Sequence, residues 1–276
     1  MSGSTSSIRN RIKSINSTKK ITGAMKSVST VKLNRMTKVT LKNNEYQDVL
    51  TKAVDALLSS NIDFDSQYCM KNEGPSLYIV FSSDVGLCGS YNQSLVDYIK
   101  KNVTQKDMLY VVGTSIYNSL KVAGYNIIND LMTSDDVDYY KTVVMYNTVL
   151  NMFLNKEVSS INVIYNRFVN SITYETVNSA MLPFEKKKTE RSEEILLEPN
   201  PEEIFDMTID LCLKSNLYNL FLNSKTSEQV ARRYAMENAT NNAEDLISDL
   251  TLEYNKARQG SITQEITEIV SGANAL

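Results

Sequence analysis

The stretch of sequence that decides the fold reads ARRYAMENATNNAEDLISDLTLEYNKARQG and covers residues 231–260. Apolar or small side chains recur in it at steps of three and four residues, which places them on one stripe of a helix. These positions are Ala239, Ala243, Leu246, Leu250, Tyr254 and Ala257. Neither proline nor glycine occurs between Pro201 and Gly260. The sequence therefore predicts one helix over about residues 202–271, roughly 105 Å long at 1.5 Å per residue.

A helix of that length needs a partner along its side, and residues 8–60 predict one. Apolar side chains recur there at helical spacing, at Ile8, Ile12, Ile15, Ile21, Met25, Val28, Val49, Ala53, Ala56 and Leu57. The two stripes are narrow, as in a coiled coil, although neither keeps a strict heptad. We expect an antiparallel pair in which acidic residues of the second helix lie near basic residues of the first. The acidic residues are Glu237, Glu244, Asp245, Asp249 and Glu253.

The middle of the chain has a different pattern, in which strands alternate with helices. Strands are predicted at 77–81, 108–113, 125–128, 160–168 and 172–180, and helices at 92–102, 114–123 and 138–156. This order predicts a Rossmann-like α/β domain inserted between the two long helices. The expected division is a coiled-coil helix at 1–60, a linker at 61–75, an α/β domain at 76–200 that ends in a charged connector, and a second coiled-coil helix at 201–276.

Composition excludes several classes of function. The 276 residues include no histidine, which removes the usual general base, the Ser/His and Cys/His nucleophile pairs and most catalytic zinc sites. The three cysteines, Cys69, Cys88 and Cys212, are too scattered for a disulfide framework or a metal site. The sequence contains no run of 18 apolar residues, so no membrane span is predicted. Residues 1–7 lack the apolar core of a signal peptide.

The loop at residues 82–90 is the one candidate for chemistry in the α/β domain. Its glycines, Gly86 and Gly89, lack the spacing of a dinucleotide fingerprint or of a P-loop. Cys88 has no histidine to activate it, so buried packing is its expected role. Ser83 and Asp84 lack the third member of a triad, and Asp84 is expected to cap the turn. The chain by itself does not look like an enzyme.

Charge is distributed unevenly, with ten basic and no acidic side chains in residues 1–44. Such an arm can bind nucleic acid or an anionic membrane, face an acidic protein, or form a solvated helix face balanced by the acidic remainder. The arm has no aromatic side chain to stack on a base, and the sequence pI is about 5.3, which argues against nucleic acid.

Four segments together resemble one known family. They are KITGAMK at residues 20–26, SDVGLCG at 83–89, AMENAT at 235–240 and YNKARQGSITQEITEIVSGANAL at 254–276. In this order, and over the whole chain, they are similar to the gamma subunit of the F-type rotary ATP synthase, and the ending is most similar to bacterial members.

The resemblance implies a non-catalytic rotor subunit with no cofactor and no metal. Its coiled-coil shaft would turn inside a ring of alternating alpha and beta subunits, where an asymmetric shaft gives each catalytic beta site a different nucleotide affinity. The α/β domain would contact the epsilon subunit and the membrane c-ring. Rotation would couple proton transport to ATP synthesis, with the subunit bound peripherally at the cytoplasmic face of a bacterial cell membrane.

The resemblance also points to residues that would contact the ring, and above all the beta subunits. Near the N-terminus these are Met25 and Lys26, in the basic arm. On the C-terminal helix they are Arg232, Arg258, Gln259, Thr263 and Glu268. Each has a plainer interpretation, since Met25 lies on an apolar stripe while Arg232 and Glu268 can be solvated. The tip at residues 262–276, which is poor in charge, would turn within an apolar collar.

The sequence departs from the family at Val85, where a basic residue is usual, at Ser90, where glycine is frequent, and at Gly260, which replaces alanine. Val85 lies in the α/β domain, so this departure leaves open which protein that domain contacts. The alternative is therefore a gamma-like rotor of a paralogous ATPase that engages something other than an ion-conducting ring. A standalone α/β enzyme and a nucleic-acid-binding coiled coil are further alternatives, and salt-dependent DNA binding would favour the last.

Overall fold

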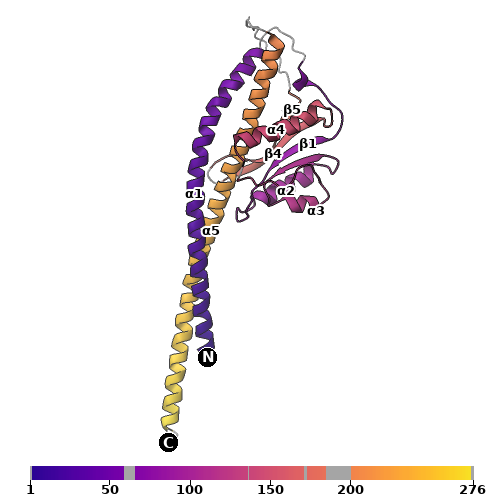
Figure 1. The fold of residues 1–276 in the computed structure, drawn as a ribbon. Helices are drawn as coiled ribbons and strands as arrows, with labels where there is room; N and C mark the ends of the chain where they lie inside the picture. Colours follow the sequence, from indigo (N-terminus) through magenta and orange to yellow (C-terminus); the bar gives the residue numbers. More distant parts are fainter. Residues whose placement is uncertain (1, 59–65, 136, 171–172, 185–199, 275–276) are drawn as a thin grey trace. The chain divides into compact units, whose positions relative to one another are not determined.

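Two long helices dominate the fold, as Figure 1 shows. In the computed structural model, helix α1 spans Ser2–Leu58 and helix α5 spans Pro201–Asn274. Both helices were expected, and α1 begins at Ser2, six residues before the expected start at Ile8. The structure describes residues 2–58, 66–135, 137–170, 173–184 and 200–274. Residues 59–60 of the expected first helix, 61–65 of the expected linker and 185–199 of the expected connector lie outside this part.

The chain forms two compact units, and each contains a segment of both long helices. The first unit combines Met1–Thr30 with Arg232–Leu276, and the second is Val31–Ala231. The second unit therefore holds the whole α/β fold together with the end of α1 and the beginning of α5. We describe each unit by itself.

The first unit is an antiparallel pair of helices. Lys19 Nζ lies 2.8 Å from Glu244 Oε1, and Lys26 Nζ lies 2.7 Å from Glu237 Oε1. Between these ion pairs, the hydroxyls of Thr22 and Thr240 are 2.8 Å apart. The partner on α5 moves toward the N-terminus as the residue on α1 moves toward the C-terminus. The predicted antiparallel coiled coil is thus confirmed, with two of the five expected acidic residues in ion pairs to the basic arm.

On each helix of the first unit, one series of buried and half-buried positions steps by four and three residues in turn, which is the heptad pattern of a coiled coil. On α1 they include Ile8, Ile12, Ile15, Lys19, Thr22, Lys26 and Ser29. On α5 they include Met236, Thr240, Ala243, Ile247, Leu250, Tyr254, Ala257 and Ser261. Several of these positions carry polar side chains, so the heptad is not visible in the pattern of apolar residues alone.

Three residues of the predicted stripes were therefore placed wrongly in this unit. Ile21 and Val28 on α1 are 61% and 57% exposed, and Leu246 on α5 is 49% exposed. The neighbouring Thr22, Ser29 and Ile247 occupy the seam instead. A one-residue step rotates a side chain by about 100° around a helix, which is enough to move it from the seam to the surface.

The second unit is built on a five-stranded sheet in the order β3-β2-β1-β4-β5. Strands β1 (Ser76–Phe81), β2 (Met108–Val112), β3 (Asn126–Ile127) and β4 (Ser160–Phe168) are parallel. Strand β5 (Tyr174–Leu182) pairs with β4 antiparallel and completes the predicted strand pair. The strand order reverses at β1, since β2 follows it on one side and β4 joins it on the other. Doubly wound folds have this arrangement.

Helices cover both faces of this sheet. Helices α2 (Tyr91–Asn102) and α3 (Tyr117–Val122) pack on the face that carries Val80, Leu109 and Val111. Helix α4 (Tyr139–Leu154) and the beginning of α5 pack on the opposite face, with Leu77 and Ile79 of β1. Asp138 caps α4 by accepting a 2.8 Å hydrogen bond from the backbone N–H of Lys141. The predicted α/β architecture, with helices on both faces, is confirmed.

The part of α1 inside the second unit joins the same core. Leu50, Val54 and Leu57 are buried, whereas the predicted Val49 is 63% exposed. The described part of the linker holds a short 3-10 helix, η1, at Gln67–Cys69, whose N-cap is Ser66. The Ser66 hydroxyl donates to Asp206 Oδ1 of α5 at 2.6 Å, so a side chain of the linker contacts the long helix directly.

Candidate functional site

The end of α5 extends past the beginning of α1. Thr22 lies opposite Thr240, and both helices rise by the same amount per residue, so Ser2 lies opposite about residue 260. The last turns of α5 consequently have no residue of α1 beside them. Four large apolar side chains are exposed there: Ile262 is 43% exposed, Ile266 56%, Ile269 71% and Val270 53%.

These four side chains form one stripe. Their spacing of i, i+4, i+7 and i+8 places them on a single side of the helix. Single exposed apolar side chains are normal on a protein surface. A continuous apolar stripe along a helix is different, because such a stripe is normally buried against another element. The end of α5 is therefore a candidate contact surface, as was predicted for this charge-poor tip.

The predicted contact residues near this end are all exposed, but they do not share one face. Gln259 and Thr263 are one turn apart on the same side of α5, and the Thr263 hydroxyl donates to the Gln259 carbonyl at 2.9 Å. Arg258 points away from them by about 100°. Glu268 is exposed on another side, where it accepts a 2.9 Å hydrogen bond from Gln264 Nε2. The structure thus brings Gln259 and Thr263 together and separates them from the other two.

The predicted residues farther along the coiled coil are less accessible. Met25 is half-buried, and Lys26 is half-buried and paired with Glu237. Arg232 is only 8% exposed, so the interpretation of this side chain as solvated is wrong, whereas Glu268 is exposed. The hydrogen bond from Lys26 and its positive charge lower the pKa of the Glu237 carboxyl below its ordinary value.

The loop after β1 turns its reactive side chains inward. Ser83 is fully buried, and its hydroxyl donates to the Val85 carbonyl at 3.0 Å. Asn92 Nδ2 donates to Ser83 Oγ at 2.7 Å and also lies 3.6 Å from Cys88 Sγ. Cys88 is 1% exposed, in agreement with the predicted packing role. A serine and a thiol that are buried and hydrogen-bonded inside the domain are not arranged to attack a substrate.

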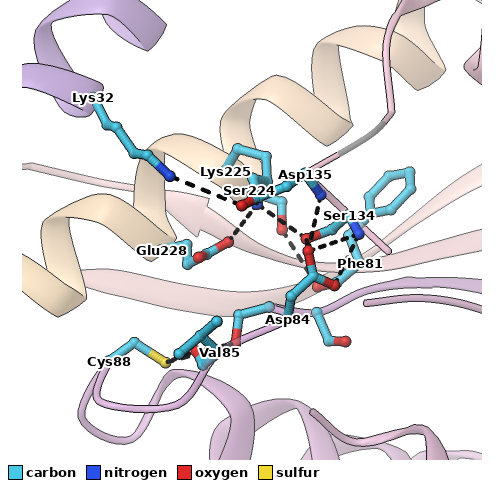
Figure 2. A network of polar contacts seen from close by, with 12 residues as sticks. Lys32, Phe81, Asp84, Val85, Cys88, Ser134, Asp135, Ser224, Lys225 and Glu228 are labelled. Atoms are coloured by element: carbon cyan, nitrogen blue, oxygen red, sulfur yellow. Dashed lines mark hydrogen bonds and ion pairs between the residues drawn. The ribbon is translucent and has the colours of Figure 1, made fainter. Parts of the chain in front are cut away.

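Asp84, which was expected to cap this turn, instead binds a different loop. Its carboxylate accepts hydrogen bonds from the backbone N–H groups of Ser134 and Asp135 at 2.9 Å, and from the Ser134 hydroxyl at 2.9 Å. It also accepts a 3.2 Å bond from the backbone N–H of Thr114. Figure 2 shows this cluster. Asp84 therefore holds together the loops that follow β1, β2 and β3 at the carboxyl edge of the sheet.

Lys225 of α5 extends the same network. Its ammonium lies 3.0 Å from Ser134 Oγ, 2.8 Å from Asp135 Oδ1 and 2.9 Å from Glu228 Oε2. The side chains of Lys225 and Glu228 are 6% and 3% exposed. Burial alone would lower the pKa of Lys225, but the nearby carboxylates of Glu228 and Asp135 outweigh it and raise the pKa above its ordinary value. Lys225 is therefore a buried cation paired with two carboxylates.

This network was not predicted from the sequence, although Lys225 and Glu228 have the i, i+3 spacing of a helical ion pair. Within the described part of the chain, no group of three or more Cys, Asp or Glu side chains is placed to hold a metal ion. Among the same residues, no helix combines the length and apolar character needed to cross a bilayer. The distinctive features of the molecule are its coiled coil, its exposed helix end and this buried polar cluster.

An α/β fold whose chain begins and ends in one antiparallel coiled coil defines a narrow structural class. The family model described as "ATP synthase" matches residues 4–276. A relative from Clostridium botulinum named "ATP synthase gamma chain" is 40% identical over 274 residues, covering 97% of this chain and 96% of its own. A relative of the same name from Mycoplasmopsis synoviae is 37% identical over 283 residues, with 97% of each chain covered.

Solved structures show the same fold. A chain from the rotor of the Euglena gracilis mitochondrial ATP synthase superposes with a TM-score of 0.69 at 19% identity, over 95% of this chain and 100% of its own. A chain from the central stalk and c-ring structure of the Tetrahymena thermophila mitochondrial ATP synthase has a TM-score of 0.56 at 25% identity, over 79% of this chain and 99% of its own. The chain belongs to the ATP synthase gamma chain family.

Proposed function

We propose that this chain is the central rotor shaft of an F-type ATP synthase, turning inside a ring of alpha and beta subunits. The observation that carries the proposal is the stripe of Ile262, Ile266, Ile269 and Val270 on a helix end that α1 does not reach. Such an end needs an apolar sleeve from other subunits, and a ring of subunits around it supplies one. Family membership over residues 4–276 supports the same conclusion.

The shaft acts without chemistry of its own. The buried state of Ser83 and Cys88 supports a non-catalytic role, because neither side chain is open to a substrate. The coiled coil is asymmetric, since its two helices carry different side chains and only α5 continues to the tip. Three beta subunits around it therefore meet three different surfaces, and rotation exchanges the states that those contacts favour. Synthesis of ATP in this scheme takes place in the beta subunits, driven by the flow of ions across the membrane.

We assign the contacts with the beta subunits to two regions of the coiled coil. Arg258, Gln259, Thr263 and Glu268 are exposed on more than one side of α5, which suits a helix surrounded by several subunits. Met25, Lys26 and Arg232 form the second region. Met25 and Lys26 are half-buried and Arg232 is only 8% exposed, so contact is limited to the exposed part of each side chain.

The remaining partners belong to the α/β domain. We propose that it contacts the epsilon subunit and the membrane c-ring, with the whole subunit bound peripherally at the cytoplasmic face of a bacterial cell membrane. The functional division of the chain in this scheme is a shaft at 1–60 and 201–276, a linker at 61–75 and an α/β domain at 76–200.

A second candidate is a gamma-like rotor of a paralogous ATPase whose α/β domain engages something other than an ion-conducting ring. The observation that favours it is the loop after β1, where Val85 and Leu87 are 59% and 58% exposed and a basic residue is usual in the family. Purification of the native complex from membranes, with identification of each subunit, separates the two candidates. Recovery of a c-ring supports the first, and its replacement by another protein supports the second.

Removal of residues 262–276 tests the shaft directly. We expect the truncated chain to assemble into a ring that binds nucleotide normally but produces less torque and couples ATP hydrolysis to ion pumping less tightly. Loss of nucleotide binding by the ring would contradict a purely mechanical role. Calorimetry of the purified chain with ATP should detect no binding, and saturable binding would argue for an enzyme.

A further inference from the structure

We propose that Lys225 and its partners form the joint through which torque passes between helix α5 and the α/β domain. This inference rests on the proposed function as a rotor. It concerns residues within the second compact unit alone, and it assigns a mechanical role to a cluster that has no part in contact with the ring. Figure 2 shows the residues involved.

The joint is a continuous series of polar contacts from the sheet to the helix. Asp84, directly beyond β1, accepts hydrogen bonds from Ser134 and Asp135. Those two residues in turn bind the Lys225 ammonium, at 3.0 Å and 2.8 Å. Glu228, one turn farther along α5, completes the shell of oxygen atoms around this ammonium. A displacement of α5 therefore pulls on the carboxyl edge of the sheet through directed bonds.

Two residues next to Lys225 hold the helix from other directions. Asn223 Oδ1 accepts a 2.7 Å hydrogen bond from the backbone N–H of Phe168, at the end of β4. Ser224 lies beside Tyr91 of α2, with 2.7 Å between the two hydroxyl oxygens. Consecutive residues of a helix point about 100° apart. Residues 223–225 thus bind three parts of the α/β fold from three sides of one helical turn.

Contacts on three sides of the helix matter because torque acts around the helix axis, and together such contacts oppose rotation about it. Contacts between apolar surfaces are not directional and oppose rotation of a helix only through the shape of the packed side chains. A buried, hydrogen-bonded ion pair has one favourable geometry, and separating it exposes an uncompensated charge to an apolar interior. The cluster is therefore suited to resist rotation of α5 relative to the sheet.

A contact from α1 reaches the same cluster. Lys32 Nζ lies 3.8 Å from Asp135 Oδ2, and both side chains are more than half exposed. At this distance and exposure the pair contributes little, since solvent screens it. Lys225 is consequently the main cation of the joint, and Lys32 is an accessory.

The test is rotation of the assembled complex under load. The complex is fixed to a surface, and a bead is attached to the α/β domain through Val122→Cys, a position that is 90% exposed on α3. Cys69 and Cys212 are replaced by serine so that the label is unique among accessible positions. With ATP, we compare rotation with a small and a large bead. We expect the Lys225→Met complex to lose several-fold more speed than the unmodified one as drag increases, because the helix slips against the domain.

Three variants decide whether this loss belongs to the joint. Lys225→Arg keeps the cation and should restore rotation under load. Leu95→Ala removes a buried side chain of α2 that lies outside the cluster, and it should lower stability without changing the response to drag. Asp135→Asn removes one carboxylate partner of Lys225 at an exposed position. If the Lys225→Met chain fails to assemble, the response of the Asp135→Asn complex to drag tests the joint in its place.

The outcomes separate this inference from the proposed function. A large bead that rotates equally well on the Lys225→Met or Asp135→Asn complex overturns the joint and leaves the rotor intact. Equal losses in Leu95→Ala also overturn it, since the effect is then one of general stability. A bead that never rotates on the unmodified complex overturns the rotor itself.

Discussion

The hydroxyl oxygens of Thr22 and Thr240 lie 2.8 Å apart and place a polar contact inside the seam between α1 and α5. Each hydroxyl is also within hydrogen-bonding distance of a carbonyl of its own helix, Lys19 O for Thr22 and Met236 O for Thr240. The pair therefore sets the register of the two helices without leaving a donor unsatisfied. Polar side chains in the seam of a coiled coil are known to fix register at some expense in stability.

Replacement of these threonines should show strong non-additivity. We expect Thr22→Val or Thr240→Val alone to lower the free energy of unfolding by about 0.5–1.5 kcal/mol, since each loses one hydrogen bond. The double variant should lose less than the sum, because two apolar groups of the same shape pack against each other. Denaturant unfolding of the purified chain measures both values. Thr251→Val, at an exposed position, is the control, and strict additivity would exclude the pair as a coupled contact.

The Lys26–Glu237 ion pair predicts a dependence of stability on acid. The pKa of Glu237 is lower in the folded chain than in the unfolded chain, so the folded state gains stability above the unfolded pKa. That gain disappears as pH falls from the unfolded pKa through the lower, folded pKa. Glu237→Gln should therefore lose less stability than the unmodified chain on acidification. Melting temperature measured as a function of pH tests this, with Glu253→Gln as the control; parallel curves for all three chains would contradict it.

Arg258 and Gln259 provide the sharpest test of the contact with beta subunits. Replacing both by alanine should slow ATP turnover of the assembled complex about threefold to tenfold, equivalent to about 0.7–1.4 kcal/mol of transition-state stabilisation. Both side chains are exposed, so folding of the chain should not change. Lys256→Ala with Asn255→Ala is the matched control on the same helix. Unchanged turnover would remove Arg258 and Gln259 from the contact surface.

Gly113 lies among the loops that Asp84 holds together, and its replacement by any residue with a Cβ is strained. Its φ of +103° lies in a region that side chains disfavour, and an added Cβ would lie 2.4 Å from the Ser82 carbonyl oxygen. We expect Gly113→Ala to lower the free energy of unfolding by at least about 2 kcal/mol, from strain and clash together. Denaturant unfolding gives the value. Gly86→Ala, where an added Cβ meets no atom within 4 Å, is the control, and a similar loss in both would refute the steric argument.

The regular elements were predictable because their signals are local. The apolar run of β1, the capping Asp138 and the absence of proline from residues 202–260 each determine nearby backbone directly. The seam of the coiled coil was less predictable, since Thr22, Ser29 and Thr240 occupy positions where an apolar residue is the usual choice. Exposed Ile21 and Val28 stand next to two of these and made a false stripe.

The polar cluster was not predictable from spacing, because its members are remote in sequence. Asp84 and Ser134 are 50 positions apart, and Ser134 and Lys225 are 91 apart. The parallel sheet gathers the loops after β1, β2 and β3 at one edge, and the packing of α5 brings Lys225 to them. The contact residues proposed on α5 were taken from the family resemblance, and the structure adds their exposure and the face each one occupies.

The exposed apolar end of α5 affects how the subunit behaves in the cell before it is assembled. Until other subunits enclose Ile262, Ile266 and Ile269, the stripe is free to adhere to any similar surface, including that of a second newly made copy. A subunit that has not been assembled is therefore prone to aggregate. Production matched to the supply of ring subunits, or rapid degradation of any surplus, would keep such copies scarce.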